Sequence, residues 1–77
     1  MWLNKNNSLQ KEFQFQDYQS ALAFVNRISI EIEKIGHHPT ITMSWGYVII
    51  NTTTHDKGNI ITKKDQQLTE LIDKLYE

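Results

Sequence analysis

The feature that most constrains the fold is an apolar stripe at helical spacing in the first half of the 77-residue chain. Apolar residues recur every three or four positions and so share one helix face; they are Tyr18, Leu22, Val25, Ile28, Ile32 and Ile35. Asp17 suits the N-cap, and Gly36 suits the C-terminal stop. Pro39 reinforces that stop, because helical geometry is disfavoured before proline. The sequence therefore predicts a helix from about residue 18 to 35.

Residues before this helix predict a β-hairpin. The segments 2–4 and 9–15 flank Asn6 and Asn7, a pair that tolerates the positive φ of a tight turn. Apolar residues alternate along the second segment, although Lys11 interrupts its apolar face. We expect two short antiparallel strands here.

A second hairpin is predicted directly after the helix. Ile41, Met43 and Trp45 alternate with hydroxyl side chains, and a β-branched run over 48–54 follows. The turn is expected near Gly46-Tyr47.

A second helix is predicted near the C-terminus. Residues 55–59 have the composition of a loop, and Thr62-x-x-Asp65 resembles a capping box with aspartate in place of the usual glutamate. The apolar stripe that follows is Leu68, Leu71, Ile72 and Leu75.

The element order is therefore ββαββα, and its length allows one domain over residues 1–77. Two hairpins and two one-sided helices bury their apolar faces most simply as an α+β two-layer sandwich. In that fold a four-stranded antiparallel sheet carries both helices on one face. The other sheet face stays available, and the number of aromatic residues suggests that it supports association into a homo-oligomer.

Composition removes several classes of function. The chain has no cysteine, which excludes disulfide frameworks and thiolate zinc folds. Eight Lys and Arg against nine Asp and Glu give a net charge of −1, so no electrostatic footprint for nucleic acid is visible. Neither a signal peptide nor a membrane-spanning apolar run is present, and we expect a cytoplasmic protein.

The predicted topology brings the three histidines together. His37 and His38 lie between the first helix and the third strand, and His55 lies just after the antiparallel fourth strand. Imidazoles titrate near neutral pH, with an unperturbed pKa of about 6.5, so two of them can serve as proton donor and acceptor at once. Glu33 and Asp65 could supply nearby carboxylates that orient a ring or bind a heterocycle.

Each of these residues also has an ordinary structural interpretation. Asp65 could act only as a cap, Glu33 could belong to a solvated helix face, and a single histidine is usually a surface residue. A zinc or iron site is disfavoured, because adjacent residues in an extended segment such as His37-His38 point to opposite sides.

The spacing of these residues resembles the signature of the pterin-4a-carbinolamine dehydratases, the family also called dimerisation cofactor of hepatocyte nuclear factor. The matching residues, in order, are Glu33-x-x-x-His37-His38-Pro39, Trp45, His55 and Asp65. Segments 12–15, 21–26 and 54–56 also resemble the family. The resemblance covers nearly the whole chain from Trp2, without the N-terminal helix usual in the family.

The resemblance implies an enzyme that dehydrates 4a-hydroxytetrahydropterin to quinonoid dihydropterin in tetrahydrobiopterin recycling, with no metal or organic cofactor. His37, His38 and His55 would bind the pterin and move protons, with His37 and His55 as the acid–base pair. Glu33, Thr54 and Asp65 would line or support the pocket. Dimers or tetramers would be expected. The alternatives are a non-catalytic pterin binder and a protein-interaction module of the transcriptional coactivator type.

Overall fold

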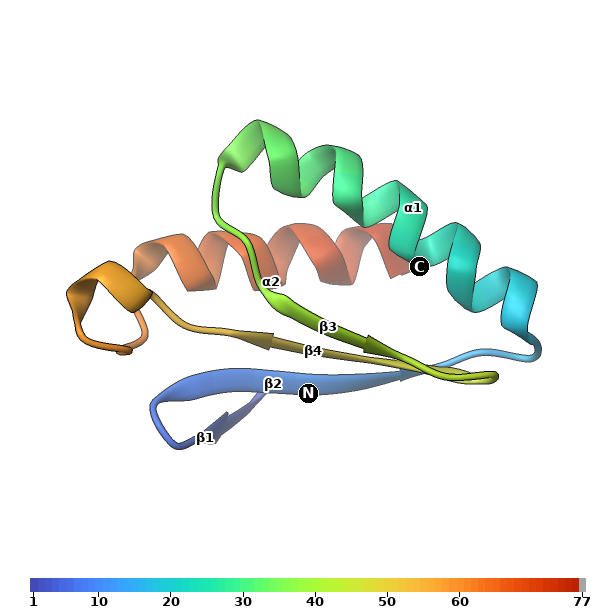
Figure 1. The fold of residues 1–77 in the computed structure, drawn as a ribbon, viewed down its shortest axis with the longest axis horizontal. Coiled ribbons are helices and arrows are strands. Elements are labelled where there is room, and N and C mark those ends of the chain that lie inside the picture. The colour runs from blue at the N-terminus through green and yellow to red at the C-terminus, as the bar shows by residue number, and fades with distance from the viewer. Residues whose placement is uncertain (77) are drawn as a thin grey trace.

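The computed structural model describes residues 1–76 of the chain (Figure 1). The elements follow one another in this order: β1 Leu3–Lys5, β2 Ser8–Gln14, α1 Tyr18–Ile35, β3 Thr40–Met43, β4 Tyr47–Thr52, η1 His55–Lys57 and α2 Lys63–Tyr76. The short 3₁₀ turn η1 lies within the expected loop. The predicted order ββαββα is therefore confirmed.

The four strands form one antiparallel sheet in the order β1-β2-β4-β3, and both helices cover the same face of it (Figure 1). Phe13 pairs with Val48, and Ile41 pairs with Ile50, so these side chains share the face that the helices cover. Phe13, Val48 and Ile50 are buried there. The α+β two-layer sandwich is confirmed.

The turn of the first hairpin and both ends of α1 lie where they were predicted. Asn6 and Asn7 have φ angles of 52° and 62°, as a tight turn requires. The Asp17 side chain accepts a hydrogen bond from the Ser20 N–H at 2.8 Å. Gly36 adopts the left-handed conformation at φ 75°, and its N–H donates to the Ile32 carbonyl. That left-handed residue redirects the chain out of the helix toward β3.

The buried face of α1 differs from the predicted stripe. Its buried residues are Ala21, Phe24, Ile28 and Ile32. Leu22 is 41% exposed, and Tyr18 and Ile35 are also exposed. The helix turns about 100° per residue, so Leu22 lies about 200° from Phe24 and both cannot face the sheet. Phe24 determines the orientation, since it fills the larger volume of the core.

An aromatic cluster explains why Phe24, and not Leu22, faces the sheet. The Phe24 ring centroid lies 5.1 Å from that of Phe13, 5.2 Å from that of Phe15 and 5.7 Å from that of Tyr76. These distances are typical of favourable aromatic pairs. Phe13, Phe15 and Phe24 thus pack between the sheet and the helices, whereas Tyr18 and Trp45 are exposed. Association through the open sheet face stays a prediction.

The second hairpin turns one to two residues earlier than predicted. β3 ends at Met43 and β4 begins at Tyr47, so Trp45 lies in the turn and is exposed. The Phe15 N–H donates to the Gly46 carbonyl at 2.8 Å. A Cβ at Gly46 would lie 3.3 Å from the Phe15 carbonyl oxygen, so this close backbone approach favours glycine.

The predicted capping box at the start of α2 is present. The Asp65 carboxylate accepts from the Thr62 N–H at 2.9 Å, and the Thr62 hydroxyl oxygen accepts from the Lys64 N–H at 3.3 Å. The stripe of α2 is largely as predicted, with Leu68 and Ile72 buried. Within residues 1–76, no helix is long and apolar enough to cross a membrane.

Candidate active site

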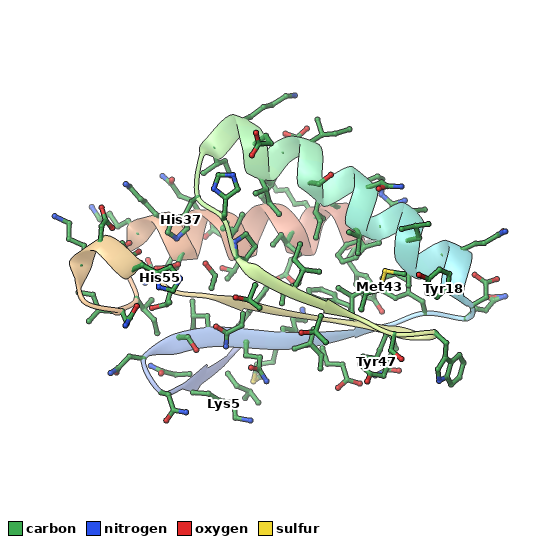
Figure 2. All side chains as sticks on the ribbon, viewed as in Figure 1. Lys5, Tyr18, His37, Met43, Tyr47 and His55 are labelled. Atoms are coloured by element: carbon green, nitrogen blue, oxygen red, sulfur yellow. The ribbon has the colours of Figure 1, made fainter. Side chains whose placement is uncertain are left out.

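Three segments of the chain meet at one end of the sandwich. The segment between α1 and β3 brings His37 and His38, the segment after β4 brings His55, and the first turn of α2 brings Asp65. Figure 2 shows His37 and His55 at the same end of the molecule, opposite to Tyr18 and Tyr47. The convergence of the histidines that the topology predicted is present.

All three histidines line one cavity of about 290 Å³. Its lining residues are Gly36, His37, His38, Thr53, His55, Asp56 and Lys64. Small-molecule sites typically span about 300–1,000 Å³, so this cavity has room for a small ring system.

The most organised contact at the cavity joins His37 to Asp65. Nε2 of His37 lies 2.6 Å from Oδ1 of Asp65. The Asp65 side chain is 0% exposed and that of His37 is 11% exposed. A charge-assisted hydrogen bond removed from water in this way holds the imidazole in a fixed orientation.

Three threonines surround the Asp65 carboxylate. The Thr52 hydroxyl donates to Oδ1 at 2.6 Å, and the Thr54 hydroxyl donates to Oδ2 at 2.7 Å. With the Thr62 N–H, the carboxylate accepts at least two hydrogen bonds on each oxygen. Asp65 is therefore both the capping residue of α2 and the partner of His37.

The ionisation of Asp65 follows from this environment. Burial raises the pKa of Asp65, but hydrogen bonds from Thr52, His37, the Thr62 N–H and Thr54 outweigh burial and lower the pKa to about 2. At neutral pH the group is a carboxylate and can only accept hydrogen bonds. His37 must therefore donate through Nε2–H, and its Nδ1 is left available for another partner.

His38 and Glu33 form a separate pair. Nε2 of His38 lies 2.5 Å from Oε1 of Glu33, and both side chains are exposed. Glu33 is not among the residues that line the cavity, and its contact with His38 joins it to the site. Because the pair is solvated, it contributes little to stability, and its main effect is to orient the His38 ring.

His55 is held by its own loop. Its Nδ1 lies 2.7 Å from Oδ1 of Asn59, a residue in the left-handed conformation after η1. With Nδ1–H donating to the amide oxygen, Nε2 is the ring nitrogen without a protein partner among residues 1–76. His37 and His55 thus each keep one ring nitrogen for a ligand.

Sequence reasoning missed Thr52 and Lys64. Thr52 follows Val48 and Ile50 on the helix-covered face of β4, and it is fully buried. A hydroxyl at the third position of a buried alternating pattern was the available signal, since a buried polar group requires a partner. Lys64 gave no such signal, because only the folded chain places it beside the histidines.

Residues 1–76 contain no group of three or more His, Cys, Asp or Glu side chains that could hold a metal ion together.

The sequence profile of a family described as pterin 4 alpha carbinolamine dehydratase matches residues 1–75. The chain belongs to this family. A relative from Prochlorococcus marinus strain NATL2A is 43% identical over 74 residues, which are 96% of this chain and 77% of that protein. A relative from Thermosynechococcus vestitus is 40% identical with the same coverage. The names of both give the dehydratase assignment as provisional.

Two solved structures share the fold. A transcriptional coactivator/pterin dehydratase from Brucella melitensis superposes with a TM-score of 0.92 at 22% identity, over 99% of this chain and 82% of that one. A pterin dehydratase-like protein, described as a RuBisCO assembly factor of the alpha-carboxysome, gives a TM-score of 0.79 at 25% identity. It covers 99% of this chain and 87% of that one. The family fold thus accompanies different described roles.

Proposed function

We propose that the protein dehydrates 4a-hydroxytetrahydropterin to quinonoid dihydropterin and water. The single observation that carries this proposal is the buried 2.6 Å contact between His37 and Asp65, at a cavity that His55 also lines. A dehydration of this kind needs one proton donor and one acceptor around the same ring, and two imidazoles meet that need.

The reaction breaks the C4a–O bond, and the hydroxyl group leaves with an added proton as water. N5 loses its proton, and the remaining electron pair forms the C4a=N5 double bond. In the proposed roles, Nδ1 of neutral His37 accepts the N5 proton, because Asp65 keeps the other proton on Nε2. Protonated His55 donates from Nε2 to the leaving hydroxyl. Solvent returns both groups to their starting states, because the cavity is open.

The other proposed site residues support this pair. His38, held by Glu33, would position the pterin at the rim of the cavity. Thr54 would act indirectly, because its hydroxyl is bonded to Asp65 and Thr62. The substrate class and the roles of all six residues rest on family membership together with this arrangement.

A second candidate is a binding or assembly role without turnover. It is favoured by the structural neighbour that is described as a RuBisCO assembly factor. Such a protein would hold a partner or a pterin and leave the carbinolamine to decay at its spontaneous rate. Turnover therefore separates the two candidates.

The test generates the carbinolamine in situ with a phenylalanine hydroxylase and follows its decay by absorbance. The protein should accelerate decay, and His37→Ala and His55→Ala should each reduce that acceleration by about 10²-fold or more. His38→Ala serves as the comparison, with most of the rate retained at a raised KM. No acceleration by the folded wild type would reject the dehydratase and favour the second candidate.

A further inference from the structure

A second cavity of about 310 Å³ adjoins the histidine cavity. Its walls are formed by Thr54, Lys57, Thr62, Lys63 and Lys64, and Lys64 lines both cavities. The two hollows are therefore neighbours that share a wall residue. The alkyl stems of the lysines can form walls while their ammonium groups reach the opening.

The three lysines form no ion pairs within the described residues. No acidic residue lines this cavity within the described part of the chain, and Asp56 lines the histidine cavity. In a chain of net charge −1, three of the five residues that line this cavity are thus lysines.

The other polar groups of this cavity already have partners. The Thr54 and Thr62 hydroxyls are bonded to each other at 2.6 Å, and the Thr54 hydroxyl also bonds Asp65. The Thr62 and Lys64 N–H groups are used in the capping box. The ammonium groups are therefore the groups left to recognise a ligand, and such groups select anions.

We propose that this lysine cavity binds an anionic side chain, a phosphate ester or a carboxylate, on the pterin whose ring occupies the histidine cavity. The inference rests on the proposed pterin function of that cavity and adds the class of substrate. The volume of the histidine cavity lies at the small end of the range for ligand sites. A substituent on a pterin ring that fills this cavity would therefore extend into the adjoining lysine cavity. The protein would then prefer pterins with a charged tail over neutral ones.

The test is calorimetric titration of the wild-type protein with three dihydropterins: 6-hydroxymethyl-7,8-dihydropterin, its pyrophosphate ester, and 7,8-dihydrofolate. We expect at least one anionic ligand to bind roughly tenfold or more tightly than the neutral one. If the pyrophosphate ester binds more tightly than dihydrofolate, the cavity recognises a phosphate ester. The reverse order identifies a carboxylate as the preferred anion. The preference should shrink between about 0.05 M and 1 M salt, because the Debye length falls to about 3 Å.

Variants assign the effect to these lysines. In a Lys57→Gln, Lys63→Gln double variant, the ratio of neutral to anionic Kd should fall toward one. Lys74→Gln is the matched control, since it removes the same charge from the same helix about 15 Å away from Lys64, and it should keep the ratio.

The outcomes are distinct. Neutral and anionic pterins that bind equally would overturn this inference and leave the pterin function standing. If neither the neutral nor the anionic pterins bind, both this inference and the proposed pterin function are rejected. Inorganic pyrophosphate that binds as tightly as the pyrophosphate ester would also overturn it, because the cavity would then be a general anion site.

Discussion

Nε2 of His37 and Oδ1 of Asp65 lie 2.6 Å apart, although 28 positions separate the two residues in the chain. The contact joins the segment after α1 to the first turn of α2, so folding of both helices is needed to form it. The same carboxylate caps α2. Helix formation and the orientation of the candidate base are therefore coupled through one side chain.

Asp65→Asn should separate these two roles. The amide oxygen can still accept hydrogen bonds, but the NH₂ group is a donor and would face other donors. In one orientation of the amide these are Thr52 and His37, and in the other they are Thr54 and the Thr62 N–H. Loss of the carboxylate should reduce carbinolamine turnover by about 10²-fold or more. The assay is the coupled decay measurement, with circular dichroism to verify folding.

Asp73→Asn is the control for that variant. Asp73 lies on the same helix and bonds Trp2 and Lys11 at the opposite end of α2, away from the histidines. It should lower stability without changing turnover. If the two variants had equal turnover, Asp65 would be a structural residue only.

The pH dependence of stability should also report Asp65. Its pKa falls from 3.8 to about 2 on folding, so the unfolded chain binds the proton more tightly. The resulting stabilisation, on the order of 2 kcal/mol, is fully present above about pH 4 and is lost as pH falls to about 2. Urea unfolding from pH 2 to 6 should therefore show a steeper loss in the wild type than in Asp65→Asn. Parallel curves would contradict the assignment.

The sequence predicted the element boundaries well because short-range contacts set them. Asp17 and Gly36 act within one turn of the helix ends, and Thr62 and Asp65 act across the first turn of α2. The buried face of α1 was not predictable in this way. Leu22 and Phe24 each fit a different apolar stripe of the same helix. Only the packing of Phe24 against Phe13 and Phe15 determines which stripe faces the sheet.

For the candidate site too, some features follow from the chain topology and others depend on side-chain packing. Topology alone brought His37, His38 and His55 to one end of the sheet, since antiparallel strands return the chain beside its starting point. The partner of each imidazole depends on side-chain packing. The sequence indicated Glu33 and Asp65 as nearby carboxylates, but which imidazole each one contacts, and the contact of His55 with Asn59, follow only from the folded chain.

Thr52 gives a prediction for a residue outside the histidine set. Thr52→Val keeps the shape but removes the donor to Asp65, which leaves one carboxylate oxygen with fewer hydrogen bonds. We expect a cost of about 1–3 kcal/mol in the free energy of unfolding and a slower turnover with little change in KM. Thr52→Ser should restore both, because the hydroxyl returns. Turnover unchanged in Thr52→Val would show that the threonine does not help to position His37.

The orientation of α1 is testable by paired truncations on the same helix. Phe24→Ala removes a fully buried ring from the aromatic cluster and should lower the free energy of unfolding by about 3–5 kcal/mol. Leu22→Ala removes a side chain that is 41% exposed and should cost much less, on the order of 1 kcal/mol or below. Urea denaturation followed by far-ultraviolet circular dichroism measures both. Similar costs would mean that Leu22 is covered in solution, and a concentration-dependent midpoint for the wild type would then identify a second copy of the chain as the cover.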